Sequence, residues 1–138
     1  MKICILSDIH GNYDALKKCL VEAKKNDAEI ILCLGDYVGY YYEPEKCIDL
    51  LIKEKAICIK GNHENILLDI FKDKKKLPLF VSKYGNGINL ALKKLKKKHV
   101  NFIKKLDDNK EIVIDNLRFL LSHGSPWDAN LYIYPNKD

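Results

Sequence analysis

Residues 3–10 read Ile-Cys-Ile-Leu-Ser-Asp-Ile-His, an apolar run that ends in an acidic residue and a histidine. The apolar run is short and continuous, which is typical of a strand buried on both faces of a parallel sheet. A helix is expected next, because Asn12 is a suitable N-cap and apolar residues recur behind it at helical spacing. These residues are Ala15, Leu16, Cys19, Leu20 and Ala23. The sequence therefore predicts a strand, a polar loop and a helix.

The same order of strand and helix is repeated in the next part of the chain. Residues 30–34 form a second apolar run, and residues 56–59 form a third. Pro44 stands between them where a helix is expected to begin, and an apolar stripe follows it. The stripe consists of Cys47, Ile48, Leu50, Leu51 and Ile52. The first half of the chain thus predicts an α/β unit of order β-α-β-α-β with right-handed crossovers.

Polar motifs follow all three predicted strands. They are Ser7-Asp8-Ile9-His10, Gly35-Asp36 and Gly61-Asn62-His63-Glu64. The carboxyl ends of parallel strands lie at one edge of an open α/β sheet, so we expect these motifs to converge there. Asp8 and His10 are two residues apart, and an extended backbone would project both side chains to the same side.

The second half of the chain has a different pattern. A helix is predicted from about Ser82 to Lys98. Two apolar runs, 112–114 and 117–121, flank Asp115-Asn116, a pair that tolerates the positive φ of a tight hairpin turn. His123 follows the second of these strands. An antiparallel hairpin is therefore expected after the parallel sheet.

Six side chains at the predicted sheet edge offer oxygen and nitrogen ligands without a thiolate. They are Asp8, His10, Asp36, Asn62, His63 and His123. Such a set suits Mn²⁺, Fe or Zn²⁺ better than it suits a structural zinc site. Asp36, held in a turn by Gly35, could place one oxygen on each of two cations. Taken singly, D-x-H is more often a helix cap with a surface histidine, and Gly-Asp is a common turn. Gly61-Asn62-His63-Glu64 is a much more specific motif.

The order of these motifs resembles the calcineurin-like metallophosphoesterase superfamily. That family's signature runs D-x-H, G-D, G-N-H followed by D or E, a later histidine, and a final G-H-x-H. The first four parts are matched by Asp8-Ile9-His10, Gly35-Asp36, Gly61-Asn62-His63-Glu64 and His123. The resemblance implies a calcineurin-like β-sandwich flanked by helices (α-β-β-α). No histidine follows His123, so the resemblance further implies that residues 1–138 form a single, C-terminally truncated domain whose second sheet is incomplete.

The family's site residues can be carried over to the matching positions. The resemblance implies two divalent metal ions, Mn, Fe or Zn, that activate a hydroxide for attack on phosphorus. The implied metal ligands are Asp8 and His10 for one ion, Asn62 and His123 for the other, and Asp36 as the bridge between them. His63 would be the catalytic proton donor to the leaving oxygen. With the final motif absent, we expect weak metal occupancy.

The resemblance implies a dinuclear metal-dependent phosphoesterase, and the phosphodiesterase-like prokaryotic branch is favoured within the family. Protein-phosphatase relatives carry G-D-x-V-D-R-G, whereas this chain has Gly39-Tyr40 in place of Asp-Arg. Tyr40, Tyr41 and Tyr42 could stack on a base or simply cover a loop. The alternative function is a noncatalytic interaction or scaffold protein built on the same fold.

Composition indicates one globular domain that does not span a membrane. Hydrophobic residues make up 47% and charged residues 31% of the chain, and no apolar run approaches the roughly 20 residues of a bilayer helix. The N-terminal run lacks the length and cleavage site of a secretory signal, so we expect a cytoplasmic protein. Five cysteines without a C-x-x-C pair are expected to be buried, reduced thiols. They are Cys4, Cys19, Cys33, Cys47 and Cys58.

The positive net charge of +5 does not favour sequence-specific nucleic-acid binding. Of the 24 basic residues only Arg118 is an arginine, which leaves almost no guanidinium groups for bidentate recognition. Lysine runs at 72–76 and 93–98 could attract polyanions, but their spacing is typical of a solvated helix face. The expected partner is a small phosphoester substrate, with a homo-oligomer formed through the strand at 117–121 as a further possibility.

Overall fold

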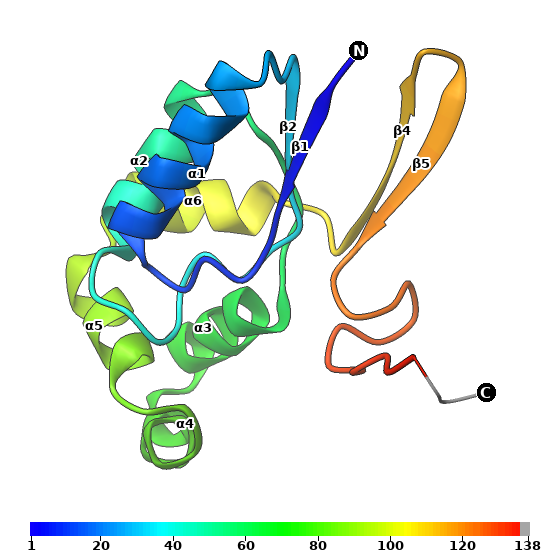
Figure 1. Cartoon of the computed structure of the whole chain (residues 1–138). Coiled ribbons are helices and arrows are strands. Elements are labelled where there is room, and N and C mark those ends of the chain that lie inside the picture. The colour runs from blue at the N-terminus through cyan, green and yellow to red at the C-terminus, as the bar shows by residue number, and fades with distance from the viewer. Residues whose placement is uncertain (136–138) are drawn as a thin grey trace.

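The computed structural model describes residues 1–135 as three layers, with helices on one face of a central sheet and a hairpin on the other (Figure 1). The central sheet is parallel and has the order β1-β2-β3. The second sheet is the antiparallel pair of β4 and β5. The strands are β1 (Ile3–Leu6), β2 (Ile30–Cys33), β3 (Ile57–Cys58), β4 (Asn109–Ile114) and β5 (Leu117–Ser122). The predicted β-α-β-α-β half and the hairpin are both confirmed.

Both predicted helix starts in the first half are confirmed. The Asn12 side chain accepts a hydrogen bond from the backbone N–H of Ala15 at 3.1 Å and caps the first helix. Pro44 is the first residue of the second helix. The helices are α1 (Tyr13–Lys25), α2 (Pro44–Lys53), α3 (Asn62–Lys72), the 3-10 turn η1 (Lys74–Lys76), α4 (Leu77–Tyr84), α5 (Gly87–Lys94) and α6 (Lys97–Lys105). No helix within residues 1–135 is long and apolar enough to cross a membrane.

The prediction of one helix from Ser82 to Lys98 is wrong. That stretch contains the end of α4, all of α5 and the start of α6. The chain turns at Gly85, which has a φ of 76°, and again at Leu95, whose backbone is extended with a ψ of 125°. These two breaks let the short helices α5 and α6 pack against α2. The lysines between Lys93 and Lys98 are exposed, so the expected solvated face is present although no single helix carries it.

The central sheet separates two apolar clusters. On the helix side, the buried cluster includes Leu16, Leu20, Cys47, Ile48, Leu51, Leu67, Ile70, Ile88 and Ile103. On the hairpin side, Leu32 of β2 and Leu121 of β5 are buried together with Ile59. The central strand β2 is therefore buried on both faces, as predicted. The strand β1 differs, because it lies at the edge of the sheet and its Ile5 is 60% exposed.

The cysteines follow the prediction only in part. All five are free thiols, and Cys33, Cys47 and Cys58 are buried. Cys4 is partly buried and Cys19 is exposed, so the expectation of burial is wrong for Cys19. Cys19 lines a surface hollow beside the edge strand β1, together with Cys4 and Leu6, whereas the buried residues of α1 are Leu16 and Leu20.

Candidate metal centre

All six residues predicted for the site line one cavity of about 450 Å³. The cavity lies at the carboxyl end of the parallel strands and reaches the segment that follows β5. The predicted residues in its wall are Asp8, His10, Asp36, Asn62, His63 and His123. The chain thus brings together side chains that are up to 115 residues apart in the sequence, from His123 back to Asp8.

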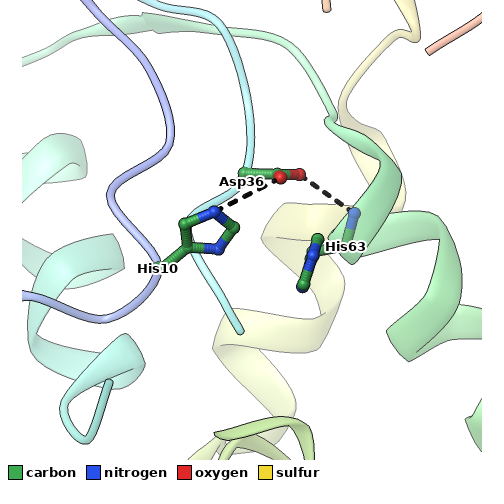
Figure 2. A group of neighbouring side chains, drawn as sticks. All are labelled: His10, Asp36 and His63. Carbon is green, nitrogen blue, oxygen red and sulfur yellow. Dashed lines mark hydrogen bonds and ion pairs between the residues drawn. The ribbon is translucent and has the colours of Figure 1, made fainter. Parts of the chain in front are cut away.

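Asp36 is the centre of this cluster. Its side chain is 3% exposed, and its Oδ2 atom lies 3.6 Å from Nε2 of His10 and 3.6 Å from Nε2 of His123. Its other oxygen, Oδ1, accepts a hydrogen bond from the backbone N–H of His63 at 2.9 Å, as Figure 2 shows. Asp8 lies at the rim, with Oδ1 3.8 Å from Nε2 of His10. One buried carboxylate therefore faces imidazole nitrogens on two sides.

The backbone around the site is left-handed rather than extended. The φ angles are 55° at Asp8, 50° at His10 and 58° at Asp36. The expectation that an extended chain aligns Asp8 with His10 is therefore wrong, although the two side chains do meet. Backbone bonds hold this shape, since the N–H of His10 donates to the carbonyl of Asp36 at 2.7 Å. Non-glycine residues with positive φ are uncommon, and three of them in one cluster are typical of a functional site.

Two histidines are oriented by hydrogen bonds to the backbone. The Nδ1–H of His10 donates to the carbonyl of Val38 at 2.9 Å, and the Nδ1–H of His123 donates to the carbonyl of Leu34 at 2.7 Å. When each ring is neutral, its free lone pair is therefore on Nε2 and faces the cluster, as in metal-binding histidines. Nε2 of His123 also lies 3.0 Å from Oδ1 of Asn62. A cation between these two acceptors would satisfy both.

His63 offers an unused nitrogen in the same cluster. Its ring lies 4.7 Å from the ring of His10, and its buried Nδ1 has no hydrogen-bond partner within residues 1–135. Burial, followed by the neighbouring His10 and His123, lowers the pKa of His63 to about 4. The ring is therefore neutral near pH 7, and a nearby anion would raise its pKa again. His63 can serve as a metal ligand or, beside an anionic group, as a proton donor.

The electrostatics of Asp36 fit a bound cation. Burial, and then the negative charge of Glu64, raise the pKa of Asp36 to about 7. A carboxylate that is costly to ionise in this environment gains most from a divalent ion beside it. Two groups of three residues have donor atoms within 4.8 Å of one another, namely His10, Asp36 and His63, and Asp8, Asp36 and His123. Asp36 belongs to both groups.

Two residues that carry the site were not assigned roles from the sequence. Glu64 is completely buried, and its carboxylate accepts four backbone N–H groups. Gly39 packs against the two histidine rings, because a Cβ atom there would lie 2.4 Å from Nδ1 of His10 and 2.7 Å from Nδ1 of His63. Glu64 was visible as the last residue of its motif. The contact of Gly39 depends on the tertiary structure and leaves no local signal.

The fold and the site together define a metallophosphoesterase domain. A parallel sheet packed on an antiparallel hairpin carries an Asp, Asn and His cluster at its carboxyl edge. The calcineurin-like phosphoesterase family matches residues 1–137, and the chain belongs to this family.

Similar proteins come from archaea and bacteria. The chain is 32% identical over 137 residues to the uncharacterized protein MJ0912 of Methanocaldococcus jannaschii, covering 97% of this chain and 54% of that protein. A metallophosphoesterase structure from Sphaerobacter thermophilus matches with a TM-score of 0.75 and 28% identity, over 97% of this chain and 51% of that one. The hypothetical protein PH1004 of Pyrococcus horikoshii OT3 matches with a TM-score of 0.77 and 20% identity, over 99% and 60%. The chain thus spans a little over half the length of its relatives.

We predict that replacing Asp36 by asparagine stabilises the metal-free protein at alkaline pH. The pKa of Asp36 is about 7 in the folded protein, above its ordinary value of 3.8. The contribution of this carboxyl group to the free energy of unfolding is therefore fully present below about pH 4 and is lost as the pH rises through 7. In a chelator, Asp36→Asn should exceed the wild type in free energy of unfolding at pH 8 by on the order of 1–4 kcal/mol, with no gain at pH 4. Urea denaturation at both pH values measures this.

The matched control is Asp27→Asn. Asp27 also has a left-handed backbone, with a φ of 57°, but its side chain is 88% exposed. This variant should differ little from the wild type at either pH. A wild type more stable than Asp36→Asn at pH 8 in chelator would contradict the electrostatic account.

A second prediction concerns Gly39. Alanine at this position would press on His10 and His63 and would also hold a φ of +143°, so we expect Gly39→Ala to weaken Mn²⁺ binding at least about tenfold. Gly85→Ala is the control, because its φ of +76° is also unfavourable but nothing lies within 4 Å of its added Cβ. Gly85→Ala should lose about 1–2 kcal/mol of stability and keep its Mn²⁺ affinity. Titration calorimetry and thermal unfolding separate the two effects, and equal Mn²⁺ affinity in Gly39→Ala and wild type would refute the packing role.

Proposed function

We propose that this chain carries the catalytic metal centre of a dinuclear, metal-dependent phosphoesterase that hydrolyses small phosphoesters, phosphodiesters among them. The observation that carries the proposal is Asp36, a buried carboxylate that belongs to both three-residue donor groups and faces two imidazole nitrogens. Family membership supports a phosphoester as the substrate. The substrate, the number of ions and their identity belong to the proposal.

The proposed metal ligands divide the cluster into two halves. Asp8 and His10 would hold one ion, Asn62 and His123 would hold the other, and Asp36 would be shared between them. Divalent ions in this position would supply a water of lowered pKa and positive charge for the phosphoryl oxygens. The protein itself fixes the ligands, since the backbone carbonyls of Val38 and Leu34 orient His10 and His123 before any ion binds. This preorganisation lowers the cost of forming the site.

In this proposal, His63 donates a proton to the leaving oxygen. Its backbone N–H is committed to Asp36, while its ring is free to face the cavity. The negative charge of a bound phosphoester beside the ring would favour its protonated form. The alternative, in which His63 is a third metal ligand beside His10 and Asp36, makes a different prediction for metal content.

The first test is Mn²⁺-dependent hydrolysis of bis-p-nitrophenyl phosphate. Wild type should bind Mn²⁺ in calorimetry and release p-nitrophenol, and Asp36→Asn should lose both because the central carboxylate charge is gone. Asp27→Asn should retain both. Equal Mn²⁺ binding by wild type and Asp36→Asn would refute the bridging role. Bound Mn²⁺ without hydrolysis would refute catalysis and favour the noncatalytic scaffold.

The second test separates the proton donor from the ligand. His63→Ala keeps the backbone N–H that positions Asp36, so it should retain its metal content. Turnover should fall about 10²–10⁴-fold on diphenyl phosphate, whose leaving group needs a proton. The loss should be much smaller on bis-p-nitrophenyl phosphate, which releases a stable anion. Loss of metal in His63→Ala, measured by elemental analysis, would make His63 a ligand instead.

A further inference from the structure

Aromatic rings surround the side of the cavity where His63 lies. The ring of Tyr40 is 5.2 Å from the ring of His63 and 4.5 Å from that of His10. The ring of Tyr84 is 5.0 Å from the ring of His63 and is itself stacked on Phe80 at 6.2 Å. His63, the proposed proton donor to the leaving group, therefore lies next to two tyrosine rings.

Two of the tyrosines are open to the cavity. Tyr40 and Tyr132 both line it, and their side chains are 48% and 75% exposed. They come from the loop after β2 and from the segment after β5, so they approach the cavity from different parts of the chain. Burial, followed by the phenol groups of Tyr132 and Tyr84, raises the pKa of Tyr40.

The neighbouring tyrosines show that this arrangement is not simply loop cover. Tyr41 and Tyr42 belong to the same loop, pack against each other at 6.5 Å and do not line the cavity. Tyr40 alone of the three turns its ring toward the two site histidines. It also stands where the protein-phosphatase motif has an arginine, so this wall presents an aromatic face in place of a guanidinium group.

We propose that Tyr40 and Tyr132 bind the nucleobase of a nucleotide-sized phosphoester, on the side of the cavity where its leaving group departs. The inference rests on the proposed function, because it takes the cavity for the substrate site. A purine or pyrimidine offers flat faces to the rings and polar edges to the phenol hydroxyls. The cavity of about 450 Å³ falls in the range of small-ligand sites.

The test compares two ligands that share a sugar and a phosphate but differ in the base. AMP and ribose 5-phosphate are titrated separately into the Mn²⁺-loaded protein, and the ratio of their dissociation constants is the readout. Stacking of a base on an aromatic side chain is strong enough that AMP should bind at least about fivefold more tightly. Any weakening of the phosphate site affects both ligands alike and leaves the ratio unchanged.

The variants locate the base. Tyr40→Leu and Tyr132→Leu should each bring the ratio toward one, whereas Tyr40→Phe should keep most of the preference because it keeps the ring. Tyr42→Leu is the matched control from the same loop, since Tyr42 is 66% exposed and lies outside the cavity wall. It should leave the ratio at the wild-type value.

The outcomes of the two proposals can be told apart. Mn²⁺-dependent hydrolysis of bis-p-nitrophenyl phosphate together with a ratio near one would overturn base recognition and leave the phosphoesterase proposal standing. A clear preference for AMP in a chain that binds Mn²⁺ but hydrolyses nothing would support base recognition and overturn catalysis. Failure to bind either ligand, or an unchanged preference in both leucine variants, would overturn the inference.

Discussion

The carboxylate of Glu64 is the interaction on which the site depends. It accepts the backbone N–H groups of Asp36, Tyr37 and Val38 from one loop, and that of Gly61 at the start of α3, at 2.7–3.1 Å. Burial raises the pKa of Glu64, and the four N–H donors act in the opposite direction. Burying a carboxylate costs free energy unless its oxygens accept hydrogen bonds, and these four N–H donors supply them. The loop after β2 and the helix α3 are thereby fixed to each other.

This constraint sets the electrostatics of Asp36. The two carboxylates are connected through the backbone of Asp36 itself, whose N–H donates to Glu64 while its side chain faces the histidines. The charge of Glu64 therefore adds to burial in raising the pKa of Asp36. The hydrogen bonds that position Asp36 also make its negative charge costly in the absence of a cation. The position of Asp36 and the cost of its negative charge thus have one physical origin.

The sequence predicted the parts of this protein that depend on local pattern. Strands and the hairpin follow from apolar runs and turn residues, and the convergence of motifs follows from the parallel sheet. The left-handed backbone at Asp8 and His10 could not be read in the same way, because loop hydrogen bonds impose it on residues that do not prefer it. The breaks at Gly85 and Leu95 were missed because the apolar spacing continues across them. The break at Gly85 has a local cause, because a glycine with positive φ ends α4 there.

His123 joins the hairpin layer to the candidate metal centre. The side chain of Leu121 packs on Leu32 and Ile59 of the central sheet, and two residues later His123 reaches the carbonyl of Leu34. Because alternate residues of a strand face opposite sides, a register shift of one residue in β5 would turn Leu121 outward and remove His123 from the site. Correct docking of the hairpin and assembly of the complete side-chain cluster are therefore the same structural event. A ligand that binds only the complete cluster must stabilise the docked hairpin by the same free energy, since binding and docking are thermodynamically linked.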